Sequence, residues 1–430
     1  MFQNKLRVSL VVYCMLLLFY SVFSYSLTDP NLVLSSWQPY WQFQTWMWQT
    51  FFSNNTLLSV TYLLLVLGLF GCFSWFVFDH AIMKKLQFVP TKKTICIFLL
   101  VISPLLFSYN ALSHDVFNYI FNAKMVTVYH ANPHQQVALD FASDDWTRFM
   151  HNTHTPAPYG YGWTILSLLP SVLGMGKFVV TWLLFRSFAV LSVLCSYFAL
   201  QLLSQEVLKR KLTVGELVPV FLNPLLLIEI VSNQHNDLWM VAPVILAVAF
   251  ALTVAKNKRA EIWKWFAVGV LLIISVSIKY ATLALLPVLI FIWLGRSLIE
   301  KIITDKLPFM AKMPRIAESM TTWVERFWLP YIPLTCSILL FLPLLIPRSQ
   351  LFHPWYLVWP LLWLPLIKQT WWRKLILLFS FTSLLRYLPW MYAGGFEDHT
   401  VLYQQLLSFS AVLLFFLFNA KKSSELRILD

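Results

Sequence analysis

The sequence predicts an all-α polytopic membrane protein with about twelve transmembrane helices. Of its 430 residues, 59% are hydrophobic and only 12% are charged, whereas a soluble domain carries about 25% charged residues. So few charges cannot cover a water-facing surface, and the mean hydropathy of +0.68 agrees with this. The apolar residues also gather in runs of the length that a membrane-spanning helix needs. These observations exclude a soluble enzyme.

The apolar runs define the expected helices in order along the chain. Their ranges are 8–27, 56–78, 94–112, 178–203, 217–233, 238–255, 262–278, 281–295, 329–346, 355–367, 374–389 and 401–419. One more apolar run, 163–174, is short and is followed almost at once by a full-length run. We interpret it as an interfacial or re-entrant helix, although its length alone does not settle whether it crosses the bilayer. No internal repeat is evident, so a single transmembrane domain is expected over 1–430.

The distribution of Lys and Arg predicts the orientation in the membrane, because cytoplasmic loops collect these residues. If alternate loops are assigned to the cytoplasm, most of the 32 Lys and Arg residues fall on that side. Both termini and the loop 296–328 are then cytoplasmic, and the long loop 113–162 is outside. The positive-inside rule therefore accounts for the net charge of +13, and no nucleic-acid partner is expected.

The long outer loop contains the first group of candidate site residues. It is rich in aromatic residues, which predicts amphipathic helices on the membrane surface after the third span. His114 and Asp115 follow that span directly, so the carboxylate of Asp115 is expected at the depth of the lipid headgroups, where it could act as a base. The other interpretation of Asp115 is an N-cap for a helix that begins at Val116. Asp144 and Asp145 are more typical of helix caps.

A second polar group interrupts two apolar runs at Asn233-Gln234-His235-Asn236-Asp237. A helix-joining turn needs only some of these residues, so five hydrogen-bonding side chains in a row favour a ligand surface, such as one for sugar hydroxyls. Glu229 precedes the turn within the same span. A buried acid in lipid is costly and should have a partner, for which Arg186 and Lys279 are candidates.

Several cations form the third group, because they lie inside the predicted spans or on the outer side. They are Arg186, Lys279, Arg348 and Arg386, with His353 nearby in the sequence. Charge-assisted hydrogen bonds to a lipid phosphate would compensate for their cost, whereas snorkelling to headgroups is the alternative. The chain lacks the P-loop, dinucleotide-binding, zinc-protease and nucleophile-elbow motifs, so no nucleotide site is expected.

A series of motifs resembles the polytopic C-type-fold (GT-C) glycosyltransferases that use polyprenyl-phosphate sugar donors, most of all the membrane alpha-mannosyltransferases of lipoglycan assembly. The matching segments, in the family's order, are Asp115-Val116-Phe117-Asn118-Tyr119, His130-Ala131-Asn132-Pro133-His134, Pro156-Ala157-Pro158-Tyr159-Gly160-Tyr161, Leu222-Asn223-Pro224-Leu225, His235-Asn236-Asp237, a loose match from Lys279 to Pro287, and His353-Pro354-Trp355-Tyr356-Leu357-Val358-Trp359. Three positions depart from the family pattern: His130 replaces Gly, His134 replaces Tyr and Tyr161 replaces Pro. These departures put the identity of the sugar in doubt.

The resemblance implies an inverting transfer of a sugar, with a mannose-like hexose favoured, from a polyprenyl-phosphate donor to a glycan or glycolipid acceptor. It implies a multi-pass protein of the plasma (inner) membrane with its active site outside the cytoplasm. Asp115 is then the expected catalytic base, and Lys279, Arg348, His353 and Arg386 are expected to bind the donor phosphate. The expected substrate-binding residues are His114, Tyr119, Asn132, Tyr159, His235, Asn236 and Asp237. No cofactor is required, although a divalent metal (Mg or Mn) is compatible with this chemistry.

Two other classes of function are compatible with the sequence. A transporter or flippase of lipid-linked sugars would place paired charges near the bilayer midplane and often shows repeated halves. A non-catalytic relative that binds a lipid-linked sugar is the second alternative, which the three motif departures allow. The small number of charges inside the predicted spans and the lack of a repeat favour the transferase.

Overall fold

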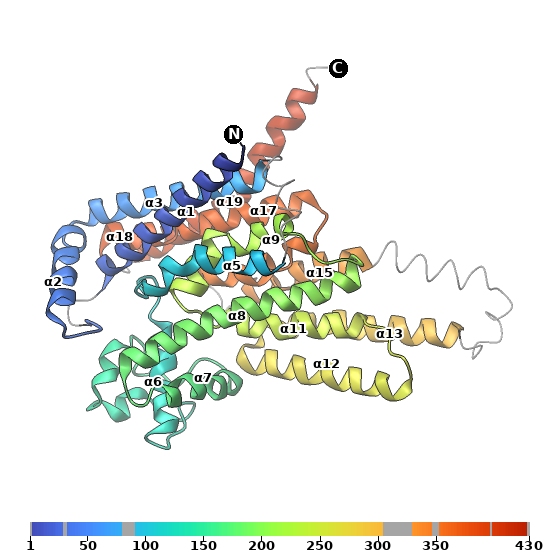
Figure 1. Ribbon diagram of the computed structural model, residues 1–430, viewed down its shortest axis with the longest axis horizontal. Helices are drawn as coiled ribbons and strands as arrows, with labels where there is room; N and C mark the ends of the chain where they lie inside the picture. The colour runs from blue at the N-terminus through green and yellow to red at the C-terminus, as the bar shows by residue number, and fades with distance from the viewer. Residues whose placement is uncertain are drawn as a thin grey trace.

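The structure, a computed structural model, describes residues 2–28, 32–79, 91–303, 329–345, 352–395 and 398–427, and the regular structure in these ranges is helical (Figure 1). The main helices are α1 (Phe2–Phe23), α2 (Gln38–Met47), α3 (Asn55–Phe78), α5 (Thr91–Ile102), α6 (Asp115–Thr127), α7 (Tyr161–Leu173), α8 (Phe178–Val207), α9 (Val214–Phe221), α11 (Asp237–Leu252), α12 (Lys258–Ile278), α13 (Leu286–Ile303), α15 (Ile332–Leu339), α17 (Thr370–Leu384), α18 (Tyr387–Ala393) and α19 (Asp398–Arg427). The all-α prediction is confirmed for these residues.

Six helices in the described ranges are long and apolar enough to cross a membrane, and a bent pair would make a seventh span. The six segments are Val8–Leu27, Asn55–Phe78, Phe178–Val207, Lys258–Ile278, Thr370–Ala393 and His399–Leu417. The predicted count of about twelve is therefore not confirmed. α7 has 13 residues, and at about 1.5 Å per residue it is shorter than the ~30 Å hydrocarbon core, as expected for a segment that does not cross alone.

The predicted span 355–367 is not one continuous helix. It consists of the short helical pieces η12 (Pro354–Leu357), α16 (Val358–Leu361) and η13 (Leu364–Leu366). Pro360 and Pro365 explain the breaks, because proline cannot donate the backbone hydrogen bond that a continuous helix requires. The segment is nevertheless buried, except that Tyr356 is half-buried. No helix was predicted at the position of α2.

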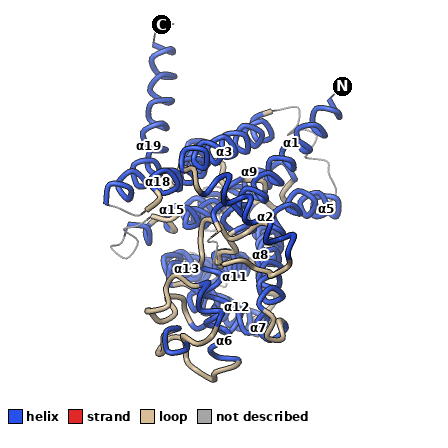
Figure 2. The backbone as a smooth tube through the Cα atoms, turned by 90° about the vertical axis from the view of Figure 1, so that its left-hand side faces the viewer, coloured by secondary structure: helices blue, strands red, loops and turns tan. Residues whose placement is uncertain are grey.

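The long helices lie beside one another, so the helix ends and the loops that connect them gather at two opposite ends of the molecule. α11 packs against α12 and α8, α17 against α19, and α1 against α3. The left end of Figure 1 contains α2 and α6, together with the C-terminal end of α1 and the N-terminal ends of α3 and α8. The connection from α11 to α12 lies at the opposite end. Figure 2 shows the loops between α6 and α7 gathered around these two helices.

One span is interrupted in the interior of the molecule. α9 is followed by α10 (Pro224–Leu226) and the π-helix η6 (Leu227–Ser232), with a bend of 53° between Val214–Phe221 and Pro224–Ser232. Asn223 begins the second part: its side chain accepts a hydrogen bond from the backbone N–H of Leu225, and Pro224 takes the first helical position. The π-helical turn then ends at Ser232, directly before the polar turn 233–237.

Arg186 of α8 satisfies the carbonyl groups at the end of η6. Its guanidinium donates to the carbonyl oxygens of Val231, at 2.5 Å, and Ser232, and to that of Ser108, at 2.6 Å. The residue is only 2% exposed, so these contacts form away from water. Arg186 therefore joins three segments through their backbones. The expectation that Arg186 could pair with Glu229 is wrong, because the ion pairs of the described residues do not join the two, and both terminal nitrogens of the guanidinium donate to these carbonyl groups instead.

We predict that Arg186→Met lowers the midpoint of thermal unfolding of the detergent-solubilised protein. Each buried carbonyl left without a donor should cost about 1–3 kcal/mol. Arg259→Met is the matched control, because Arg259 is exposed at the start of α12. Equal unfolding midpoints for the two variants would show that Arg186 does not hold the end of η6.

Candidate active site

The polar turn 233–237 lies in the core, between η6 and the N-terminus of α11. All five of its residues are at most 3% exposed. The turn closes through Gln234, whose φ of 62° lies in the left-handed region, and through a backbone hydrogen bond from His235 to Glu229. A π-helical turn followed by a strained residue is typical of functional sites.

Asn110 attaches the segment before α6 to this turn. Its side-chain oxygen accepts from Gln234 Nε2 at 3.1 Å and from Trp182 Nε1 at 2.7 Å, and its amide donates to the carbonyl of Ser232. Segments more than 100 residues apart in the sequence are thereby held together. This contact places the start of α6, and with it Asp115, beside His235.

Asp115, His235 and Glu229 form a line from the accessible surface into the core. His235 Nδ1 lies 3.4 Å from Asp115 Oδ2, and His235 Nε2 lies 3.4 Å from Glu229 Oε2. The side chain of Asp115 is 22% exposed, whereas those of His235 and Glu229 are fully buried. Asp115 is the first residue of α6, and its N-cap is His114, so the interpretation of Asp115 as an N-cap is wrong.

The contact between Asp115 and His235 shifts the pKa of each residue so that its charged form is favoured. Burial alone would raise the pKa of Asp115, but the hydrogen bond and charge of His235, with smaller effects of Lys279 and Tyr159, lower it to about 2. Burial alone would lower the pKa of His235, but Asp115 and Glu229 raise it to about 9. At neutral pH Asp115 is therefore a carboxylate and His235 is an imidazolium.

A second ion pair neutralises Asp237. Its Oδ1 accepts from Lys279 Nζ at 2.8 Å and from Trp359 Nε1 at 2.5 Å. Asp237 is fully buried, whereas the side chain of Lys279 remains 15% exposed. Lys279 thus pairs with Asp237, so the expectation that it could pair with Glu229 is wrong. Glu229 instead accepts from the hydroxyl of Tyr387 at 2.9 Å and from the amide of Asn233 at 3.1 Å.

Two glycines allow the loop at Tyr159 to lie against the end of α12, directly before Lys279. The N–H of Gly160 donates to the carbonyl of Ile278 at 3.0 Å. A Cβ atom on Gly160 would lie 2.0 Å from the carbonyl oxygen of Ser277, and one on Gly162 would lie 2.0 Å from its Oγ. The close approach brings the ring of Tyr159 to 5.8 Å from Lys279 Nζ.

Tyr119 packs against the rings of Tyr159 and Trp163. Its ring centroid lies 4.9 Å from that of Tyr159 and 5.0 Å from that of Trp163, both in edge contacts. Tyr119 itself is only 1% exposed. Both tyrosines that were expected to bind substrate lie near Asp115, since burial and the charge of Asp115 raise the pKa of each, and Tyr159 also lies beside Lys279.

A stack of three rings joins the turn to the segment that begins at His353. The ring of His235 lies 3.9 Å from that of Trp355, which lies 4.3 Å from that of His353. Burial and the positive charge of Arg386 lower the pKa of His353 to about 3, so this residue is neutral at pH 7 and cannot add a positive charge. Arg386 is 5% exposed, and within the described residues its Nη1 has no hydrogen-bond partner. Arg348 lies outside the described residues.

Several polar atoms in the turn have no partner among the residues that the structure describes. They are Gln234 Oε1, both side-chain atoms of Asn236, Asp237 Oδ2 and the two ring nitrogens of His235, whose carboxylate neighbours lie 3.4 Å away. Buried polar atoms are nearly always paired, and exceptions cluster where a ligand, water or catalysis uses them. These atoms are of the kinds that bind hydroxyl groups.

The other predicted residues lie in the outer loop. His114 stacks against His151, with ring centroids 3.7 Å apart. Asn132 accepts from the backbone N–H of His134 and contacts the hydroxyl of Tyr161 at 3.5 Å. Asp144 does cap a helix, because it accepts from the N–H of Trp146 at 2.9 Å.

The described residues contain no group of three or more His, Cys, Asp and Glu side chains placed to hold a metal ion. We therefore derive no step that uses a metal.

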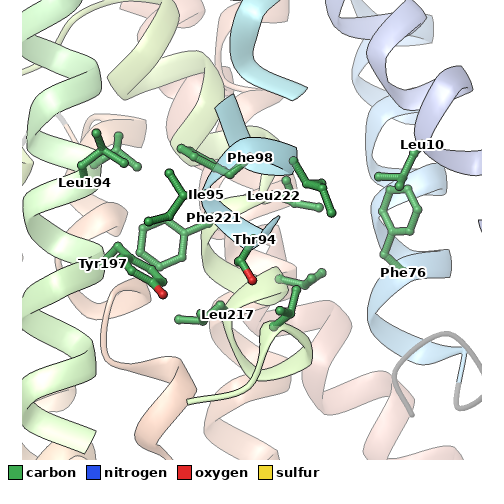
Figure 3. A pocket seen from close by; sticks show the side chains of 14 residues that line it. Leu10, Phe76, Thr94, Ile95, Phe98, Leu194, Tyr197, Leu217, Phe221 and Leu222 are labelled. Carbon is green, nitrogen blue, oxygen red and sulfur yellow. The ribbon is translucent and has the colours of Figure 1, made fainter. Parts of the chain in front are cut away.

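A separate cavity of about 130 Å³ lies between α1, α3, α5, α8 and α9 (Figure 3). Ile95 and Phe98 of α5 and Phe221 and Leu222 of α9 contribute to its wall, and within the described residues no charged side chain lines it. An apolar void of this size stays dry and can hold an apolar group. It has no groups for acid–base chemistry, so the polar cluster is the candidate active site.

Three comparisons with known proteins were made. A family model described as "Alpha-(1->6)-mannopyranosyltransferase, N-terminal domain" matches residues 31–295. The matched range contains Asp115, Glu229, His235, Asp237 and Lys279. No curated protein and no solved structure matches the chain.

We predict that Gly160→Ala disrupts the loop at Tyr159, because the new methyl group would overlap a backbone carbonyl that cannot move without shifting the end of α12. A loss of about 1–3 kcal/mol of stability is expected, measured by thermal unfolding. Gly162→Ala should cost less, since a side-chain hydroxyl can rotate away. Gly269→Ala is the control, because its Cβ would meet nothing within 4 Å. Equal behaviour of Gly160→Ala and Gly269→Ala would contradict the close approach.

Proposed function

The chain belongs to the alpha-(1->6)-mannopyranosyltransferase family, and from this premise we propose that it transfers a mannose-like hexose from a polyprenyl-phosphate donor to a lipid-linked or glycan acceptor. The family and the apolar helices make it a membrane glycosyltransferase. The donor, the side of the membrane and the roles of single residues are our proposal.

One observation carries the assignment of the base. Asp115 is a partly exposed carboxylate whose ionised form is held by a buried imidazolium. Its rival Asp237 is fully buried and has one oxygen occupied by Lys279 and Trp359. A general base must reach the proton that it removes, so accessibility favours Asp115.

The proposed reaction is an inverting displacement. The acceptor hydroxyl oxygen attacks the anomeric carbon of the donor sugar while Asp115 takes the hydroxyl proton. The bond between that carbon and the phosphate oxygen breaks, and its electron pair leaves with the polyprenyl phosphate. The developing negative charge on the phosphate requires nearby cations or hydrogen-bond donors. The amides of Gln234 and Asn236 can bind sugar hydroxyls.

Arg386 is the best-supported contact for the donor phosphate. One of its guanidinium nitrogens has no hydrogen-bond partner among the described residues, and an unpaired buried guanidinium is costly unless a ligand compensates for it. His353 would contribute as a neutral hydrogen-bond donor. Lys279 already binds Asp237, but its ammonium group has three N–H groups and is partly exposed, so it can contact a phosphate as well.

The proposed location is the outer side of the plasma (inner) membrane, with both termini in the cytoplasm. The positions of Lys and Arg in the sequence support this orientation. The arrangement of α2 and α6 at one end of the molecule, with the α11–α12 connection at the other, is compatible with it. A lipid-linked donor fits an outer site, because the lipid carries its sugar across the bilayer whereas sugar nucleotides remain inside.

We predict that Asp115→Asn abolishes sugar transfer while donor binding persists. Asparagine keeps the size of the side chain but cannot accept the proton, so turnover should fall about 10²–10⁴-fold. Transfer from radiolabelled polyprenyl-phosphate mannose to membrane acceptors measures the first effect, and donor binding to the purified protein measures the second.

Asp237→Asn is the comparison for that experiment, because it should mainly weaken substrate binding. Normal transfer by Asp115→Asn would remove Asp115 as the base. An inactive Asp237→Asn that still binds donor would then place the base in the turn.

We also predict that Arg386→Gln raises the donor concentration needed for half-maximal rate about tenfold or more, since a charge-assisted hydrogen bond to the phosphate is lost. Arg148→Gln is the control, because Arg148 is an exposed cation of the outer loop. If both variants keep the donor dependence of the unaltered protein, Arg386 does not contact the donor.

A further inference from the structure

Glu229 is the buried titratable group for which the proposed reaction has no role. It lies in the middle of η6, it is fully buried, and it is 3.4 Å from His235 Nε2. Its two neutral partners, Tyr387 and Asn233, fix the positions of both carboxylate oxygens. A glutamine could pack here without the cost of burying a charge, so the presence of a carboxylate requires an explanation.

The ion pairs of the described residues give Glu229 one charged partner, which is His235. His235 in turn contacts Asp115 through its other ring nitrogen. A carboxylate lies 3.4 Å from each ring nitrogen, and two negative charges on opposite sides of the ring favour its protonated form. Trp355 stacks on the ring at 3.9 Å, which fixes its orientation.

We infer that Glu229 is a positioning residue that keeps His235 protonated while Asp115 acts as the base. This inference rests on the proposed function of Asp115. When Asp115 takes the proton of the acceptor hydroxyl, it becomes neutral and no longer stabilises the charge of His235. Glu229 lies on the opposite side of the ring and keeps its charge. His235 therefore stays protonated beside Asp115 Oδ2, so that the other carboxylate oxygen remains directed to the acceptor throughout the reaction.

Removal of Glu229 should change how activity depends on pH. The charged and titratable groups around His235 are Asp115 of α6, Glu229 of η6, Asp237 of α11, Lys279 after α12, His353 before η12, and Arg386 and Tyr387 at the start of α18. Among the ion pairs of the described residues, those of its ring nitrogens are with Asp115 and Glu229. Activity that requires the imidazolium should persist below the pKa of His235 and be lost as the pH rises through it.

The experiment compares the pH dependence of kcat for full-length wild-type protein, Glu229→Gln, Glu229→Asp and Glu216→Gln, with polyprenyl-phosphate mannose as donor. We call the part of the profile where kcat falls with rising pH the alkaline limb. Glu229→Gln removes one carboxylate beside His235, so the alkaline limb should move to lower pH by about one unit or more. At a fixed pH on that limb, kcat should then be about tenfold lower than in the wild type. The donor KM should change little. Glu229→Asp keeps the charge at a greater distance and should shift the limb less.

Glu216→Gln is the matched control, because Glu216 is also ion-paired, to Arg210, but lies in the capping box of α9. It should lower stability without moving the limb. An unshifted limb in Glu229→Gln would overturn the inference, even if kcat falls with the amount of folded protein. If Glu229→Gln does not fold, the limb of Glu229→Asp decides in the same way. Failure of the proposed function is a separate result, since it would appear as undiminished transfer by Asp115→Asn.

Discussion

The contact of Arg186 with the end of η6 is the interaction on which the polar cluster depends. A helix that stops in an apolar interior leaves carbonyl groups without donors, at about 1–3 kcal/mol each. Arg186 donates to the carbonyls of Val231 and Ser232 and also to that of Ser108 in the preceding segment. The helix can therefore end before Asn233, and five consecutive polar residues enter the core.

Charge balance then determines which groups remain available for chemistry. Asp115 and Glu229 share His235, and Asp237 pairs with Lys279. Among these four acids and bases that surround His235, only Asp115 and Lys279 are reached from outside. Arg386 keeps a guanidinium nitrogen without a partner in the part of the chain that the structure describes. An accessible carboxylate and a cation with an unused hydrogen-bond donor suit a reaction with a neutral nucleophile and an anionic leaving group.

The sequence predicted the residues of this cluster better than their pairings. Asp115 and the turn 233–237 could be found because polar residues directly at the ends of apolar runs are costly and stand out. The partners of Glu229 could not be found in this way, because they depend on how the turn 233–237 folds back on η6 and on how α18 packs there, and hydrophobic periodicity carries no information on such contacts. Tyr387 was missed for the same reason. Proline positions, in contrast, explain the breaks in 355–367 from local chemistry alone.

The three departures from the family motifs lie between residues 130 and 161, and two of them contact each other. The rings of His134 and Tyr161 are 3.9 Å apart, and His134 Nε2 lies 2.9 Å from the hydroxyl of Thr164. His130 has a φ of 52°, which lies in the left-handed region that glycine adopts most readily. These changes form one altered patch between α6 and α7, whereas Asp115, His235, Glu229 and Lys279 form a connected set of their own. A change of sugar or acceptor in this chain is therefore expected to act through the patch, with the acid–base machinery unaltered.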